Sequence, residues 1–253
     1  MSQFSLNPNS LTRKEGIKRY KSIVGSLSWF AISLRYDIAH SVTRLQQYSC
    51  NPTEGALDAA IRVAGYLAAT ADFRLGGRRV LGNKLEYFSD SDHAGDPKVT
   101  YQSHTGIIFS LNSVPIQWRS KKQPKTVISP AMAEIYACSE CVKEATWVQY
   151  MLEEFGVAMQ WPMSIQVDNK QVISFCRNSC LHSRLRGCVD LREDWVRQLR
   201  DQGQVKILKV KGEVNPADLL TKCLARQKFE DLKDCCGVTA VGERKLKKGR
   251  VAL

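Results

Sequence analysis

The stretch Leu85-Glu86-Tyr87-Phe88-Ser89-Asp90 decides the fold, because it is the first of several predicted β-strands. Its aromatic residues favour extended backbone, although its apolar and polar residues alternate imperfectly. Two more strands are predicted at residues 105–111 and 114–118, with Asn112-Ser113 as the turn between them. Three strands so close together in the sequence are expected to pair antiparallel to one another.

Helical and strand patterns alternate further along the chain. Apolar residues recur at helical spacing from residue 131 to residue 155, and Gly156 ends the predicted helix. Two short strands are predicted at residues 165–168 and 205–210, and two helices between them at residues 172–175 and 191–199. A final helix is predicted to begin at Pro216. This order predicts an α/β fold in which a mixed five-stranded sheet carries helices on its faces.

The residues before this sheet are predicted to be entirely helical. Apolar residues recur at helical spacing between residues 17 and 70, and Asn51 or Thr53 is suited to cap the third helix. We therefore expect a small helical bundle at residues 1–80 and a sheet-containing domain at residues 81–230. The third unit is a basic tail at residues 231–253, which is expected to be disordered and whose charges also suit a nuclear address or a nucleic-acid arm.

The composition favours an intracellular protein that contacts a polyanion. The formal net charge is +12, which favours nucleic acid as the partner, with plain solubility as the alternative. No apolar run approaches the roughly 20 residues that cross a bilayer, and the first 18 residues lack the apolar core of a secretory signal. The nine cysteines lack the spacing of zinc sites, so we expect free thiols in a reducing compartment.

Four acidic residues stand where strands end or helices begin. Asp90 closes the first strand and Asp168 ends the fourth, while Glu134 and Asp218 lie in the first turns of two helices. In the predicted sheet these side chains can converge on one edge. Close carboxylates raise one another's pKa, and divalent cations relieve that repulsion. The plain alternative is that acids are common at such places, because helix N-termini favour negative charge.

Oxygen-only ligands decide which cation such a cluster would take. They suit Mg²⁺ or Mn²⁺ and do not suit zinc. Two ions roughly 4 Å apart can hold a phosphodiester between them, with one activating water and the other stabilising the leaving oxygen. The residues alone therefore predict a candidate metal site for phosphodiester chemistry.

A series of short motifs runs through this part of the chain. With x for any residue, they are aromatic-x-D-x-D-x-A-G at 88–95, S-x-S/T-G near 103–106, W-x-S-K-K-Q near 117–123, S-S-x-E-A-E-Y near 129–137, E-A-x-W at 144–147, D-N at 168–169 and A-D-x-x-T-K at 217–222. In this order they resemble the ribonuclease H domain of copia-type retrotransposon Pol polyproteins. Residues 20–27, 35–39 and 62–67 are similar to the end of that family's reverse transcriptase, which implies a remnant of its thumb.

The resemblance implies a ribonuclease H-like fold and a specific reaction. Two Mg²⁺ ions, or Mn²⁺ in their place, would serve to cut the RNA strand of an RNA–DNA hybrid during retrotransposon replication. Asp90, Glu134, Asp168 and Asp218 would be the catalytic metal ligands, and Asp90 would touch both ions. The implied partners are the hybrid and the polymerase part of the same polyprotein, with no membrane. The implied location is the cytoplasm, within the retroelement particle, and also the nucleus.

Departures from the family pattern leave a second function open. No Tyr-x-Asp-Asp motif is present, so DNA synthesis is not expected of this chain alone. Gly187-Cys188-Val189-Asp190 stands where the family has K-H-I-D, and Met132 and Ile135 replace a glutamate and a tyrosine. The alternative is therefore a catalytically inactive or domesticated ribonuclease H-like module that binds nucleic acid.

Basic and polar residues near these motifs are candidate contacts for the hybrid. They are Arg119, Lys121, Lys122, Asn169, Arg184 and Arg186. Arginine and lysine supply the salt-sensitive contacts to phosphate, and Asn169 is suited to a 2′-hydroxyl. The alternatives are that the lysines beside Trp118 are simply solvated and that Asn169 only begins its helix.

Overall fold

The computed structural model describes residues 14–76, 84–95, 101–177 and 191–240 of the chain. Its helices are α1 (Lys14–Ser33), η1 (Tyr36–Ile38), α2 (Ala39–Gln46), α3 (Glu54–Ala69), α4 (Pro130–Glu154), α5 (Lys170–Arg177), α6 (Leu191–Asp201), η2 (Pro216–Leu220) and α7 (Arg226–Cys235). Its strands are β1 (Phe73–Leu75), β2 (Leu85–Asp92), β3 (His104–Leu111), β4 (Val114–Lys122), β5 (Met163–Val167), β6 (Val205–Lys209) and β7 (Val238–Ala240). Among the described helices, none has the length and apolar character of a membrane span.

The expected mixed five-stranded sheet is confirmed. Its strand order is β4-β3-β2-β5-β6, with antiparallel pairing across β2, β3 and β4 and parallel pairing of β2 with β5 and of β5 with β6. The turn between β3 and β4 falls at Asn112 and Ser113, whose φ angles of 51° and 65° suit a tight hairpin. Topology therefore places the ends of β2 and β5 side by side.

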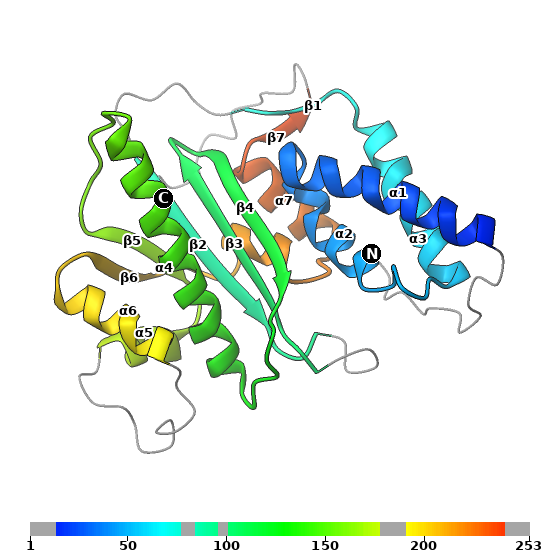
Figure 1. The fold of residues 1–253 in the computed structure, drawn as a ribbon. Helices are drawn as coiled ribbons and strands as arrows, with labels where there is room; N and C mark the ends of the chain where they lie inside the picture. Colours follow the sequence, from blue (N-terminus) through cyan, green and yellow to red (C-terminus); the bar gives the residue numbers. More distant parts are fainter. Residues whose placement is uncertain (1–13, 77–83, 96–100, 178–190, 241–253) are drawn as a thin grey trace.

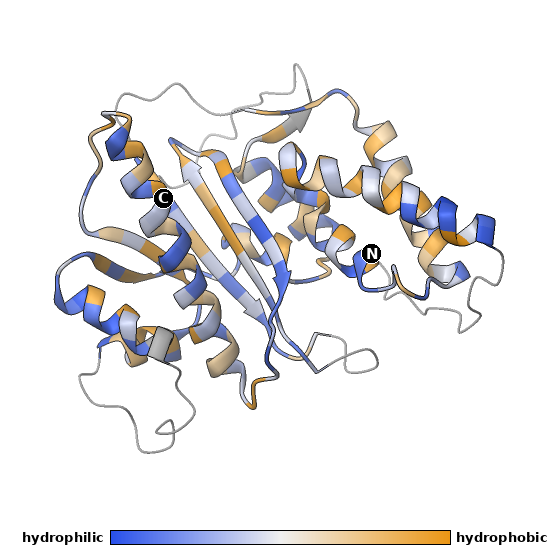
Figure 2. Cartoon of the chain, in the orientation of Figure 1, coloured by the Kyte–Doolittle hydropathy of each residue, from blue (hydrophilic) through white to orange (hydrophobic). Residues whose placement is uncertain are grey.

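Two hydrophobic cores lie on the two faces of this sheet. Alternate residues point to opposite faces, so Tyr87 and Ile107 pack toward α4, α5 and α6, whereas Phe88 and Ile108 pack toward α1, α2 and α3. Figure 1 shows α4 lying along one face and the helices α1 and α2 beyond β4. Figure 2 shows hydrophobic residues along the central strands and a mixture of hydrophobic and hydrophilic residues on the helices.

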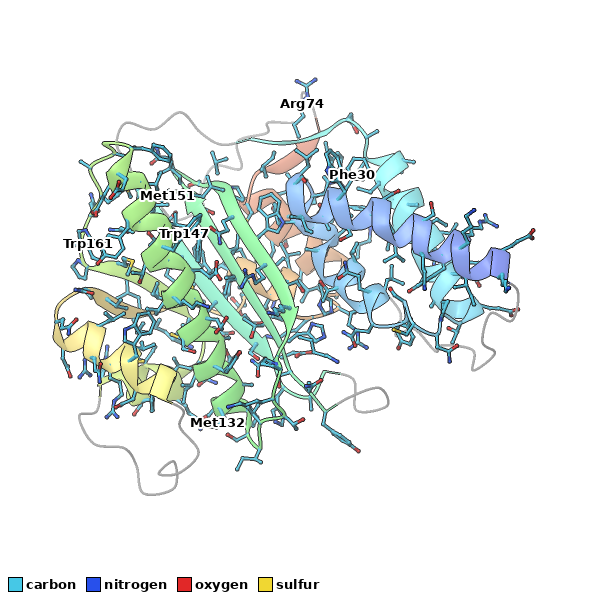
Figure 3. The ribbon with its side chains drawn as sticks, viewed as in Figure 1. Phe30, Arg74, Met132, Trp147, Met151 and Trp161 are labelled. Atoms are coloured by element: carbon cyan, nitrogen blue, oxygen red, sulfur yellow. The ribbon has the colours of Figure 1, made fainter. Side chains whose placement is uncertain are left out.

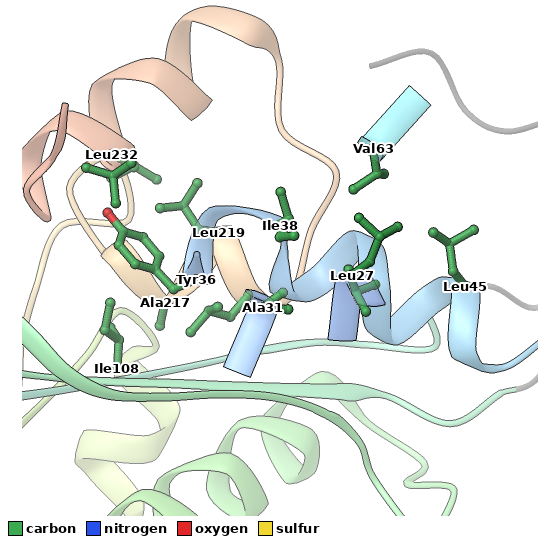
Figure 4. Packing of buried hydrophobic residues seen from close by; sticks show 14 of the residues in the cluster. Leu27, Ala31, Tyr36, Ile38, Leu45, Val63, Ile108, Ala217, Leu219 and Leu232 are labelled. Atoms are coloured by element: carbon green, nitrogen blue, oxygen red, sulfur yellow. The ribbon is translucent and has the colours of Figure 1, made fainter. Parts of the chain in front are cut away.

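The helical segment shares its core with the sheet. Tyr36 lies against Leu219, Leu232 and Ile108 in the same hydrophobic cluster (Figure 4), and its hydroxyl donates to the carbonyl of Lys233 at 2.9 Å. The indole of Trp118 on β4 donates to the carbonyl of Ala31 at 2.6 Å. The helical segment before residue 80 and the sheet after it therefore share one hydrophobic cluster.

Helix ends follow the expected chemistry. The hydroxyl of Thr53 accepts a hydrogen bond from the amide of Ala56, so Thr53 caps α3 as one of the two expected candidates. Gly156 follows α4 with a φ of +77°, a conformation that glycine adopts without strain. Among the described residues, five cysteines that form no disulfide are Cys50, Cys138, Cys141, Cys176 and Cys223.

Two expectations about the end of the chain need correction. The segment from Pro216 is a 3-10 helix of five residues, and α7 begins separately at Arg226. The tail expected to be disordered from residue 231 is folded as far as residue 240. Leu232 and Val238 are buried, and β7 pairs with β1, a strand that the sequence did not predict. Residues 241–253, with the basic run, lie outside the described residues.

Candidate active site

Three of the four predicted acids meet at one end of the sheet. Asp90 stands near the end of β2, Asp168 follows the parallel neighbour β5, and Glu134 lies in the first turns of α4. One oxygen from each of these carboxylates lies within 4.8 Å of the others. Figure 3 labels Met132 and Met151 toward opposite ends of α4, and Glu134 is two residues from Met132 in the sequence.

Burial raises the pKa values of two of these carboxylic acids, Asp90 and Glu134. Asp90 is 0% exposed, and burial raises its pKa to about 6, with Lys222 opposing that shift and Asp218 adding to it. Burial, together with the charges of Asp90 and Asp168, raises the pKa of Glu134 to about 9. Charge repulsion and loss of water therefore act together on this cluster.

The residues present fit a hard divalent cation. The donor set consists of carboxylate oxygens, which Mg²⁺ and Mn²⁺ prefer. One oxygen of Glu134, Oε2, is buried and has no hydrogen-bond partner among the described residues. A buried polar atom without a partner is costly, and a bound cation would satisfy it. No ion is part of the structure described here.

Asp218 lies beside this group and is held by lysines. It is not one of the three residues whose oxygens lie within 4.8 Å of one another. The ammonium of Lys222 lies 2.9 Å from Asp218 Oδ1 and 3.1 Å from Asp90 Oδ1, and that of Lys228 contacts Asp218 Oδ2. The sequence reasoning missed Lys222, although its position four residues after Asp218 signals a helical ion pair.

A glycine lets the 3-10 helix η2 approach the sheet. Gly106 pairs with Asp90 across β3 and β2. A Cβ at Gly106 would stand 2.7 Å from the carbonyl oxygen of Ala217 and 2.7 Å from Cγ2 of Thr221. Because that space is free, the hydroxyl of Thr221 reaches Asp90 Oδ2 and donates a hydrogen bond to it.

Gln123 joins the elements that carry two of the acids, and the sequence reasoning gave it no role. Its buried amide Nε2 lies 3.2 Å from Ser91 Oγ, 3.0 Å from Thr105 Oγ1 and 3.0 Å from the carbonyl of Ala133. Ser91 is next to Asp90, and Ala133 is next to Glu134. Gln123 therefore ties the end of β2 to the start of α4 and sets the distance between their carboxylates.

Asp92 serves the sheet and not the carboxylate group. Its Oδ1 accepts a hydrogen bond of 2.6 Å from the amide of His104 at the start of β3. Its carboxylate is not among the three that lie within 4.8 Å of one another.

The candidate nucleic-acid contacts have different surroundings. Lys121 and Lys122 pair with Thr105 and His104, so they lie at the same end of the sheet as Asp90. Arg119 forms an ion pair with Glu144 at 2.9 Å, and this carboxylate partly neutralises the charge of the guanidinium. Asn169 Oδ1 accepts a hydrogen bond from the amide of Gln171 at 2.7 Å, as expected of a residue that begins a helix. Arg184, Arg186 and the altered segment 187–190 lie outside the described residues.

An open cleft lies beside Asp168 and Asp218. It has a volume of about 510 Å³. Eight residues line it: Asp168, Lys209, Lys211, Gly212, Glu213, Asp218, Lys222 and Lys228. Four of them are lysines, so the cleft combines acidic groups that suit a cation with basic groups that suit a phosphate.

Comparisons with known proteins give related sequences. The chain is 34% identical over 221 residues to a retrovirus-related Pol polyprotein from transposon TNT 1-94 of Nicotiana tabacum, covering 87% of this chain and 16% of that protein. It is 35% identical over 222 residues to the corresponding polyprotein from transposon RE1 of Arabidopsis thaliana, covering 88% of this chain and 15% of that one. The chain thus spans a small part of these relatives. No family model matches it.

Among solved structures, LC11-RNase H1, isolated from compost, is similar to this chain at 12% identity and a TM-score of 0.42. The similarity covers 59% of this chain and 97% of that one.

Proposed function

Because the chain belongs to the retrovirus-related Pol polyproteins of copia-type transposons, we propose that it hydrolyses the RNA strand of RNA–DNA hybrids. The observation that carries this proposal is the meeting of Asp90, Glu134 and Asp168 at one end of the sheet. The reaction would serve retrotransposon replication, next to the polymerase part of the same polyprotein. Its setting would be the cytoplasm, within the retroelement particle, and also the nucleus.

Two divalent cations, Mg²⁺ or Mn²⁺, complete the proposed site. Asp90, Glu134 and Asp168 would hold the first, and Asp90 with Asp218 would hold the second. When bound, such ions supply charge stabilisation for a phosphoryl group and lower the pKa of water. The orphaned Glu134 Oε2 and the all-oxygen donor set support this assignment.

The chain's own groups orient the carboxylates and bind the duplex. The hydroxyl of Thr221 donates to Asp90 Oδ2, and the ammonium of Lys222 lies 3.1 Å from Asp90 Oδ1. Lys121 and Lys122 are proposed to contact the phosphate backbone, with Arg119, Arg184 and Arg186 as further basic contacts and Asn169 near a 2′-hydroxyl. We expect the shape of the duplex, and little of its base sequence, to be recognised.

Replacing one carboxylate tests the proposal directly. The purified chain with Mg²⁺ is expected to cut a labelled RNA–DNA hybrid and to leave single-stranded RNA uncut. Asp168→Asn keeps the side-chain shape but removes a charge from the group. It should lower the cleavage rate on the order of 100-fold or more, the scale on which loss of one active-site electrostatic group acts. Binding of the hybrid, followed by fluorescence anisotropy, should persist.

Asp58→Asn is the matched control, because Asp58 is exposed on α3 and far along the chain from the site. It should cut as fast as the wild type. Wild-type protein that binds the hybrid but cuts nothing in either Mg²⁺ or Mn²⁺ would favour the inactive, nucleic-acid-binding module instead.

A further inference from the structure

Lys222 stands between two carboxylates that are proposed to share a cation. Its Nζ lies 3.1 Å from Asp90 Oδ1 and 2.9 Å from Asp218 Oδ1. Asp90 and Asp218 are 0% and 2% exposed, so neither can rely on water to offset its charge. Lys222 follows Asp218 by one turn, which delivers its ammonium to this place.

The ammonium and a second divalent cation would compete for the same position. Any ion bridging Asp90 and Asp218 must bind the oxygens to which Lys222 now donates. A divalent ion beside the ammonium would also be repelled by it, and charge repulsion is strong where water is excluded. The first position shares Asp90 with Lys222, but it also includes Glu134, whose Oε2 has no partner among the described residues and is open to a cation.

The side chain of Lys222 also has open space beside it in the cleft. Its side chain is 38% exposed, and it lines the open cleft beside Lys209 and Lys211. A rotation of this flexible side chain can therefore carry the ammonium out of the space between the two acids without moving η2 or β2.

We propose that Lys222 is a built-in counter-ion for the second cation position, so that a second divalent ion binds only as this ammonium leaves Asp90 and Asp218. The inference rests on the proposed metal site and adds the order in which the two ions bind there. The first ion binds at Asp90, Glu134 and Asp168, and the second binds more weakly because it must displace Lys222.

The test is a metal titration that needs no enzymatic activity. Mn²⁺ binding to the intact chain is measured by isothermal titration calorimetry, with free Mn²⁺ counted by electron paramagnetic resonance. The wild type should show one tighter and one weaker ion. Lys222→Met should tighten the weaker ion by roughly tenfold or more, the effect expected from removing one unit charge at contact distance. The affinity of the tighter ion should change much less.

Lys228→Met is the matched control. It removes the same charge from the same cleft, but Lys228 contacts Asp218 Oδ2 and not Asp90. Its effect on the weaker ion should be clearly smaller than that of Lys222→Met. Lys222→Arg keeps the positive charge and should leave the second ion weak.

Other outcomes separate this inference from the proposed function. Two ions of equal affinity in the wild type, or equal effects of Lys222→Met and Lys228→Met, would overturn the role of Lys222 while leaving the metal site intact. Binding of no ion at all would overturn both. If Lys222→Met fails to fold, as judged by its thermal unfolding, Lys222→Gln keeps a donor for Asp90 and carries the same expectation.

Discussion

At the scale of single residues, Glu134 should make the metal-free protein sensitive to pH. Its pKa in the folded chain is raised from its ordinary value of 4.5 to about 9, chiefly by burial. The folded state therefore holds this proton over a range in which the unfolded state has lost it. Stability from this group is complete below the unfolded pKa and is lost as pH rises toward 9. Asp90, with a pKa of about 6, acts in the same direction at lower pH.

Glu134→Gln should remove much of this dependence. In a chelator, the melting temperature of the wild type should fall between about pH 6 and pH 9. The melting temperature of the variant should fall less over this range. At about pH 8 its free energy of unfolding should exceed that of the wild type by roughly 1–3 kcal/mol, the cost of burying an unsatisfied polar group. Differential scanning calorimetry across this range measures both effects.

Glu154→Gln provides the comparison, because Glu154 is exposed at the other end of the same helix. It should leave the pH profile as in the wild type. Burial lowers the pKa values of His40 and His104 to about 3 and about 4, so these two groups oppose the fall below about pH 7 and the comparison is made above it. A wild-type melting temperature that stays level or rises with pH would contradict the burial of an uncompensated Glu134 carboxyl.

At the scale of elements, the contact between η2 and β3 depends on Gly106. Gly106→Ala would bring a methyl group to 2.7 Å from the backbone of Ala217, so η2 would have to shift. We expect a loss of roughly 1–3 kcal/mol in the free energy of unfolding, as for other overpacked sites. The shift should also move Thr221 and Lys222 from Asp90 and reduce cleavage of the hybrid. Urea unfolding and cleavage rates measure the two effects.

Gly25→Ala shows what the same substitution does without a neighbour. Gly25 is exposed inside α1, and a Cβ there meets nothing within 4 Å. It should stabilise the chain by about 0.5–1 kcal/mol through helix propensity and leave cleavage unchanged. If Gly106→Ala proved equally harmless, η2 would not be held against β3 as closely as the structure indicates.

The sequence predicted those elements whose signals are local. The aromatic residues of β2, the Asn112-Ser113 turn and the helical spacing of α4 are signals that lie within a few neighbouring residues. The pairing of β1 with β7 could not be predicted in this way, because each strand has three residues and the partners lie at distant places in the chain. Pro216 signalled a helix start but not whether the helix would be α or 3-10.

In the candidate site, too, some features could be predicted from the sequence and others depend on long-range contacts. The convergence of Asp90 and Asp168 was predictable, because a shared sheet edge brings the ends of β2 and β5 together, and Glu134 joins them from the first turns of α4. The lysine between Asp90 and Asp218 depends on how η2 crosses the sheet, and the sequence pattern does not fix that crossing. The bridging amide of Gln123 depends likewise on three elements meeting at one point.

At the scale of the whole molecule, the helical segment and the sheet should unfold together. Leu27 on α1 is 3% exposed and belongs to the same hydrophobic cluster as Phe88 on β2 and Leu220 of η2. The indole of Trp118 ties β4 to α1 as well. One continuous core across residues far apart in sequence favours a single cooperative transition. Leu27→Ala should therefore weaken the sheet, although Leu27 lies outside it.

We expect Leu27→Ala to lower the free energy of unfolding by about 2–5 kcal/mol, the usual cost of emptying a buried leucine site. Amide hydrogen exchange at β2 and β3 should quicken with it, because these amides open by global unfolding when the helical segment and the sheet share a core. Exposed Ile32→Ala on the same helix, where the side chain is 73% exposed, should change exchange at the sheet little. Exchange that quickens in α1–α3 alone would mean that the helical segment opens independently, and its contacts with Trp118 and Leu220 would then contribute little to the stability of the sheet.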